Sequence, residues 1–185
     1  MYIGSEKSLK LRLLLPSIVI LAVCSTFDVA PGYRNSIVAS TCAEPKFHNL
    51  ARYKGQRWSQ VFMDPEVAKA LKALLKNDMA KLKESLKEVS YPEDSLSYVD
   101  KNGVLTLEGG VPGLYTIMEA KLVIEPCGKI YAAILDQGER FLYFTNDSRG
   151  ADKMNPAIEQ WRVKIEALRS QSSNVPELPI VFKTR

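Results

Sequence analysis

The side chains that could carry chemistry are few and scattered in this 185-residue sequence. A Ser-His-Asp or Cys-His site would have to use the single histidine, His48, which lies outside any nucleophile motif. Glu108, Glu119 and Glu125 offer paired carboxylates of the kind that cleave glycosidic bonds, but acids along strands are usually solvated. The P-loop, GxGxxG, HExxH and CxxC patterns do not occur in the sequence. We therefore predict no catalytic residues, no metal ligands, no cofactor and no enzymatic turnover.

The segment Gly109 to Thr116 (GGVPGLYT) is the most distinctive candidate for recognition. Three glycines and a proline shape its backbone, and loops held on a rigid sheet commonly carry recognition. Leu114 and Tyr115 supply an apolar and an amphipathic contact group, although these side chains could equally complete the core. Both interpretations stay open from the sequence. The first places a partner-binding surface on Gly110, Val111, Pro112, Gly113, Leu114 and Tyr115.

Two helical patterns come before this segment. Asp64-Pro65-Glu66 is a strong helix start. Asp is a favoured N-cap, Pro is tolerated at the first helical position, and an acid in the first turn, here Glu66, complements the helix dipole. Asn77-Asp78 restarts the pattern. The apolar positions at helical spacing are Val67, Ala70, Leu71, Leu74 and Leu75, followed by Met79, Leu82, Leu86 and Val89.

From Ser95 onward, apolar residues recur at every second position, which is typical of strands. We expect strands near 96–99, 104–108, 120–125, 129–135 and 139–145, with a hairpin turn at Asn102-Gly103. A final helix begins at Asn155-Pro156 and carries Ile158, Trp161, Ile165 and Leu168, and Ile180 to Phe182 could add an edge strand. The prediction is one α+β domain over 44–185, with an antiparallel meander sheet of about four or five strands flanked by helices.

Residues 1–43 are predicted to be a signal peptide and leader. Lys7, Lys10 and Arg12 precede a short apolar run, Leu13 to Cys24, which is too short to span a membrane; an uncleaved anchor or a buried helix is the alternative. Ala39 to Ala43 offers a cleavage region, and Cys24 approaches a lipid-acylation site. These features favour a periplasmic or envelope-associated protein.

The charge balance of the chain argues against a nucleic-acid partner. The chain holds 25 basic and 21 acidic residues, and residues 44–185 hold 21 basic and 19 acidic residues, so we expect no nucleic-acid partner. If Cys42 survives removal of the leader, it could pair with Cys127; otherwise Cys127 is a lone thiol.

With these elements placed, the chain resembles the inhibitor of vertebrate lysozyme family of bacterial envelope proteins. The likeness covers roughly Leu71 to Leu168 and rests on Val104 to Gly109, Ala120 to Glu125 and Ile130 to Leu135. That family has a sheet-and-helix fold whose loop, Cys-Lys-Pro-His-Asp-Cys, plugs the lysozyme active-site cleft. The corresponding stretch here is Gly110 to Tyr115, where only Pro112 matches; another register aligns the family's final Cys-Gly with Cys127-Gly128.

The resemblance implies an inhibitor-like scaffold with a different loop. We expect an exported binding protein, an inhibitor or immunity protein that occludes a cell-wall hydrolase or similar toxin. The near-neutral domain would not steer towards a cationic animal lysozyme. The alternatives are an envelope lipoprotein with a structural or interaction role and an unrecognised envelope enzyme. Membrane contact is expected only through the signal or a lipid anchor, and a homodimer stays open.

Overall fold

A computed structural model describes residues 44–86, 97–148, 152–171 and 176–184, all of which belong to the unit of the chain that spans 38–185. The predicted leader, with its cleavage region, Cys24 and Cys42, lies outside these ranges. Within them, no helix is both long enough and apolar enough to cross a membrane.

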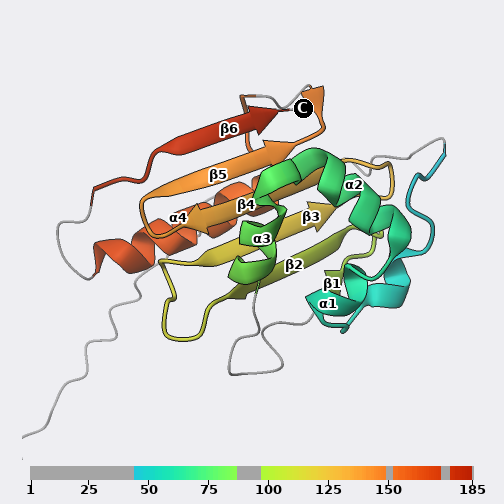
Figure 1. Ribbon diagram of the computed structural model, residues 1–185, viewed down its shortest axis with the longest axis horizontal. Coiled ribbons are helices and arrows are strands. Elements are labelled where there is room, and N and C mark those ends of the chain that lie inside the picture. Colours follow the sequence, from blue (N-terminus) through green and yellow to red (C-terminus); the bar gives the residue numbers. More distant parts are fainter. Residues whose placement is uncertain (1–43, 87–96, 149–151, 172–175, 185) are drawn as a thin grey trace, which may run out of the picture. The chain divides into compact units, whose positions relative to one another are not determined.

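The scaffold is a six-stranded sheet in which each strand lies beside its neighbour in the sequence (Figure 1). The strands are β1 (Tyr98–Val99), β2 (Leu105–Gly110), β3 (Glu119–Ile124), β4 (Ile130–Asp136), β5 (Arg140–Thr145) and β6 (Ile180–Thr184). The first four pairings are antiparallel, and only β5 and β6 pair in parallel. This arrangement confirms the α+β prediction, and β6 extends the five-stranded meander by a sixth strand.

The turn between β1 and β2 forms as its sequence predicts. Oδ1 of Asp100 accepts hydrogen bonds from the backbone N–H groups of Asn102 (2.8 Å) and Val104 (2.9 Å). Gly103 adopts a φ of +77°, which glycine tolerates without steric cost. Val99 therefore pairs with Leu105, and β2 enters the sheet in a fixed register.

The sheet is buried on both faces, because helices cover each side (Figure 1). Its interior strand β4 is buried from Ile130 to Leu135, as its continuous apolar run predicts. Alternate side chains of the strands pack into two cores. One core includes Leu107, Leu122, Ile134 and Phe144, and the other includes Val123, Leu135, Phe141 and Tyr143.

Short helices cover the first face. They are η1 (Leu50–Tyr53), α1 (Trp58–Val61), α2 (Pro65–Leu75), η2 (Lys76–Asp78) and α3 (Met79–Ser85). The predicted start of α2 is confirmed: Asp64 caps it by accepting hydrogen bonds from the backbone N–H groups of Glu66 (2.8 Å) and Val67 (3.0 Å). The same carboxylate accepts hydrogen bonds from Tyr53 and Arg52, which ties the segment before the helix to its N-terminus.

Helix α4 (Pro156–Ser170) covers the second face. It begins after the N-cap Asn155, as predicted, and buries Ile158, Trp161 and Ile165 against the sheet. Leu168, which the periodicity places with them, is 43% exposed. Because α4 lies between β5 and β6 in the chain, it forms the crossover that a parallel strand pair requires.

Candidate functional site

The β2–β3 loop, Val111 to Met118, connects two strands at one end of the sheet (Figure 1). It begins two residues later than the predicted segment, because Gly109 and Gly110 belong to β2 and pair with Ala120 and Glu119. The main-chain N–H of Val111 donates to the carbonyl of Met118 across 2.9 Å, which closes the base of the loop. The predicted recognition segment therefore combines the end of a strand with a closed loop.

The two glycines at the end of β2 allow contacts that a side chain would block. A Cβ atom on Gly109 would lie 3.1 Å from the carbonyl oxygen of Leu86, just beyond the end of α3. A Cβ atom on Gly110 would lie 2.8 Å from Cγ of Glu119 and 3.3 Å from the ring of Tyr115. Gly110 is buried, so it supports Tyr115 rather than offering an exposed contact of its own.

Three hydrogen bonds hold the β2–β3 loop to different parts of the scaffold. The backbone N–H of Thr116 donates to Oε1 of Glu119 on β3 (2.5 Å). Nη1 of Arg169, near the end of α4, donates to the Thr116 carbonyl (2.9 Å). The N–H of Gly138, in the β4–β5 turn, donates to the Ile117 carbonyl (2.7 Å). The loop is thus preorganised, although Thr116 adopts a φ of +64° that is uncommon for a non-glycine residue.

The tip of the loop faces solvent. Residues 112–115 are all exposed, with Leu114 at 38% and Tyr115 at 44% of their full surface. Ile117, which the sequence interpretation did not single out, is 40% exposed beside them. Of the two interpretations left open, the structure disagrees with the one in which Leu114 and Tyr115 complete the core. The exposed Ile117 could have been noticed as a third apolar residue within four positions.

Glu119 is the buried acid beneath the loop, with 8% of its surface exposed. Burial raises the pKa of its carboxyl above the usual value, and the negative charge of Glu108 adds to this. The hydrogen bond from the Thr116 N–H and the charge of Lys164 oppose the rise. Glu119 is consequently an anchor whose charged form is disfavoured by its surroundings.

The three acids considered for catalysis serve different parts of the fold. Glu108 forms an ion pair with Lys121 (2.8 Å) and lies 3.9 Å from Lys164 on α4. Glu119 is covered by the loop, and Glu125 lies at the opposite end of β3. Glu108 and Glu119 are electrostatic neighbours, but the buried Glu119 is committed to the Thr116 amide. Their geometry fits an anchor for the loop better than an acid–base pair open to a sugar chain.

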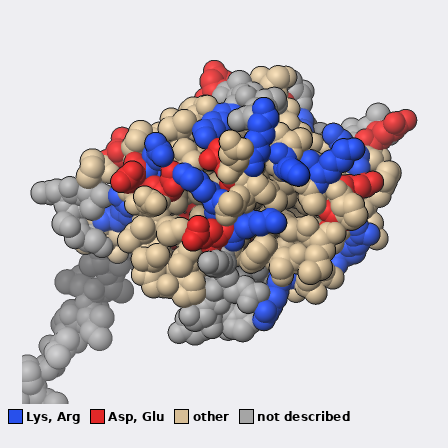
Figure 2. All heavy atoms as spheres, in the orientation of Figure 1, with Lys and Arg blue, Asp and Glu red and all other residues tan. Residues whose placement is uncertain are grey.

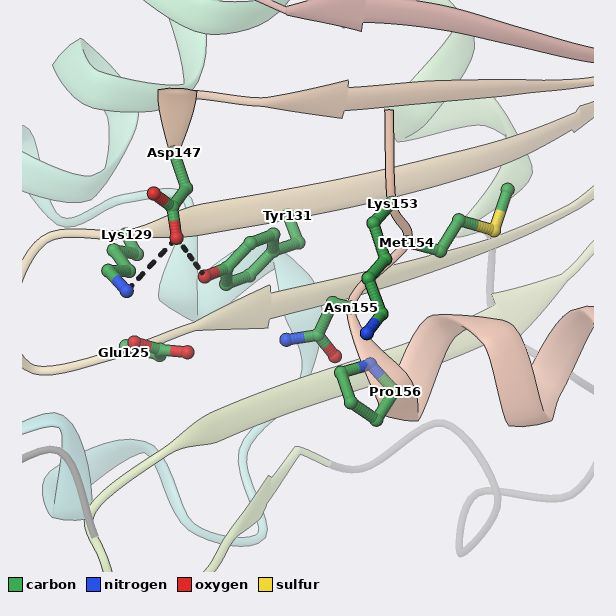
Figure 3. Close-up of a pocket in the computed structure, with 8 residues that line it drawn as sticks. All are labelled: Glu125, Lys129, Tyr131, Asp147, Lys153, Met154, Asn155 and Pro156. Atoms are coloured by element: carbon green, nitrogen blue, oxygen red, sulfur yellow. Dashed lines mark hydrogen bonds and ion pairs between the residues drawn. The ribbon is translucent and has the colours of Figure 1, made fainter. Parts of the chain in front are cut away.

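A shallow pocket of about 430 Å³ lies at the far end of β3 from the β2–β3 loop. Its lining residues are Glu125, Lys129, Tyr131, Asp147, Lys153, Met154, Asn155 and Pro156. Asp147 forms an ion pair with Lys129 (3.0 Å) and accepts a hydrogen bond from the Tyr131 hydroxyl (3.1 Å), as Figure 3 shows. Burial is the main cause that raises the pKa of Tyr131, so its hydroxyl stays protonated.

The adjoining N-terminus of α4 offers few free donors to this pocket. Pro156 has no N–H, and the N–H of Ala157 donates to the Asn155 side chain (2.9 Å). The N–H of Ile158 donates to the Asn155 carbonyl (3.0 Å). The polar groups thus largely bond to one another, which favours a role in fixing the ends of β4, β5 and α4.

The described part of the chain holds few other candidate side chains for catalysis or metal binding. His48 is exposed and lies before η1. Among the residues that the structure places, no cluster of three His, Cys, Asp or Glu side chains could hold a metal ion. Cys127 is disulfide-bonded, whereas the other two cysteines of the chain, Cys24 and Cys42, lie outside the described part. The lone-thiol alternative for Cys127 is therefore wrong.

Comparison of the chain with protein-family models, curated proteins and solved structures gave no match in any of the three. The resemblance to the lysozyme-inhibitor family accordingly stays a prediction.

Proposed function

We propose that this protein is an exported binding protein that uses the β2–β3 loop to occlude another protein, as an inhibitor or immunity protein against a cell-wall hydrolase or similar toxin. The observation that carries the proposal is the exposed apolar group of Leu114, Tyr115 and Ile117 on a loop held by hydrogen bonds to β3, to α4 and to the β4–β5 turn. A preorganised loop loses little conformational entropy on binding.

An exported location is supported by two features. The first 43 residues carry the pattern of a leader, with positive charges before a short apolar run. Cys127 is disulfide-bonded, and structural disulfides persist mainly in oxidising compartments such as the periplasm. Neither feature depends on the loop, so the location and the binding role can be tested separately.

A protein target suits the loop better than a small ligand does. The three apolar side chains are exposed on a loop between two strands, whereas small-molecule sites are concave and enclose their ligand. A tyrosine can bury a large ring while its hydroxyl keeps a polar partner, and tyrosine is enriched at the centres of interfaces. We expect the loop to enter the active-site cleft of the target and to exclude its substrate.

The proposal is tested by measuring binding to, and inhibition of, a panel of purified cell-wall hydrolases and toxins. For a target that binds, Tyr115→Ala and Leu114→Ala should each weaken affinity about thirtyfold, as expected for loss of a central anchor worth about 2 kcal/mol. The matched control is Tyr98→Ala on β1, because Tyr98 is also an exposed tyrosine, at 61%, and lies away from the loop.

The control should bind as the unchanged protein does. Equal losses for Tyr115→Ala and Tyr98→Ala would show that the loop is not the specific contact. A target that is bound tightly but retains full activity would contradict occlusion, and unchanged affinity in both loop variants would overturn the proposal.

A further inference from the structure

β6 is the longer of the two strands that lie at the edges of the sheet. β1 and β6 lie at the ends of the strand order, and β1 has only two residues whereas β6 has five. Figure 1 shows β6 (red) outermost, parallel to β5. In the described part of the chain, no strand pairs with its outer side. An open edge of this length is a template for pairing with another strand.

The sequence of β6 lacks the features that usually protect such an edge. Its residues are Ile-Val-Phe-Lys-Thr, all of which except the lysine favour strands, and it contains no proline. Val181 and Phe182 are 36% and 39% exposed, and they point to opposite faces because side chains alternate along a strand. The apolar surface therefore continues to the rim of the sheet on both faces.

The one charged residue of β6 forms an ion pair within the chain. Nζ of Lys183 pairs with Oδ2 of Asp78 (2.8 Å) and lies 5.2 Å from the centre of the Phe144 ring. Lysines on edge strands normally deter pairing by placing a charge across the edge. Here the lysine is paired with Asp78 on one face of the sheet, so a strand with a neutral residue opposite it can approach, whereas a second lysine directly opposite would still be repelled.

We propose that two copies of this protein dimerise by antiparallel pairing of their β6 strands. The direction of the unused backbone groups follows from the β5–β6 pairing. The backbone N–H of Phe141 on β5 donates to the carbonyl of Pro179, just before β6. Because bonded positions alternate along a parallel ladder, the backbone N–H and C=O groups of Val181 and Lys183 also point towards β5. The N–H and C=O groups of Ile180, Phe182 and Thr184 then face outward.

One register satisfies these groups best. Centring the twofold axis on Phe182 pairs it with the same residue of the second copy, and pairs Ile180 with Thr184, so that all five residues overlap. It also places Val181 opposite Lys183. A register shifted to centre on Lys183 would oppose two lysines directly, which is destabilising, and one centred on Val181 shortens the overlap. The strand is thus self-complementary, which a twofold interface requires.

This pairing is independent of the proposed inhibitory role. Strand order puts β6 three strands from β3, about 14 Å away at the usual spacing, so the β2–β3 loop stays uncovered in the dimer. Loop variants should leave the dimer unchanged, and edge variants should leave the affinity of each loop for its target unchanged.

A charge pair at Val181 tests both the interface and its register. Val181→Lys sets a lysine against Lys183 of the second copy twice per dimer, whereas Val181→Glu sets an opposite charge there. Sedimentation equilibrium of the purified chain should give a dissociation constant at least about tenfold higher for the lysine variant than for the glutamate variant. Both variants place one charge at the same exposed position, so each controls for loss of the valine.

Hydrogen exchange gives a second, independent readout. The Phe182 amide should exchange slowly in the dimer, and quickly in the monomeric lysine variant. A chain that remains monomeric at all concentrations would overturn the proposal, as would a dimer with equal dissociation constants for the two variants. Slow exchange of the Phe182 amide in a monomer would also overturn it, because another part of the same chain would then cover the edge.

Discussion

Replacement of Glu119 should release the β2–β3 loop without unfolding the protein. Glu119→Ala removes the oxygen that accepts the Thr116 N–H at 2.5 Å, beneath a loop whose φ at Thr116 is +64°. Leaving a buried donor without its acceptor costs about 1–3 kcal/mol, so the Thr116 amide should exchange about five- to a hundredfold faster at neutral pH. Glu119→Gln is the matched control, because its amide oxygen can still accept the bond.

The assay is residue-resolved hydrogen exchange under native conditions, which reports the free energy of local opening. The amide of Leu122 in β3 serves as an internal reference and should keep its exchange rate, because it belongs to the sheet. Exchange of the Thr116 amide within about twofold of the unchanged protein, or equal acceleration in the alanine and glutamine variants, would refute the reasoning.

The raised pKa of Glu119 adds a pH dependence with a defined sign. Burial is the main cause of the rise, so the folded state binds the proton more tightly than the unfolded state does. The stability that this provides is complete below the usual pKa of glutamate and is lost as pH rises through the folded-state pKa. Glu119→Gln cannot titrate, so its free energy of unfolding should not show this decline in urea titrations between pH 4 and pH 8.

Two further predictions concern the helix start and the leader. Asp64→Ala should lower the free energy of unfolding by about 2–4 kcal/mol in urea titration, because it removes an N-cap and leaves the buried Tyr53 hydroxyl without its acceptor. Asp64→Asn keeps the cap and should lose less; a loss below about 0.5 kcal/mol for the alanine variant would contradict this account. Burial alone would raise the pKa of Asp64, but its hydrogen bonds and Arg52 lower it, so its contribution should fade as pH falls through that folded-state pKa. Mass spectrometry of protein from envelope fractions should place the mature N-terminus between Ser25 and Glu44. If the mature chain keeps Cys42, Cys127 should resist alkylation until it is reduced, because the chain then still holds a second cysteine. An intact Met1 on the exported protein would count against the leader.

The sequence by itself determined the elements whose signals are local. Asp64-Pro65-Glu66 specified the start of α2 because capping involves groups only two or three residues apart. Asn102-Gly103 specified the β1–β2 turn because backbone conformation at a glycine is a local property. The apolar run Ile130 to Leu135 specified a strand covered on both faces. The position of the β2–β3 loop followed from these elements, since it is what remains between two strands.

Tertiary structure decided how distant residues meet, and no local pattern encodes that. The ring of Tyr115 lies over Gly110, Glu119 holds Thr116, and Arg169 reaches the loop from the end of α4, 53 residues along the chain. The parallel pairing of β6 depends on α4 carrying the chain back across the sheet, so the edge position of Phe182 could be assigned only once the strand order was known. Such contacts depend on packing between elements far apart in the sequence, whereas propensity and periodicity describe only each element's own neighbours.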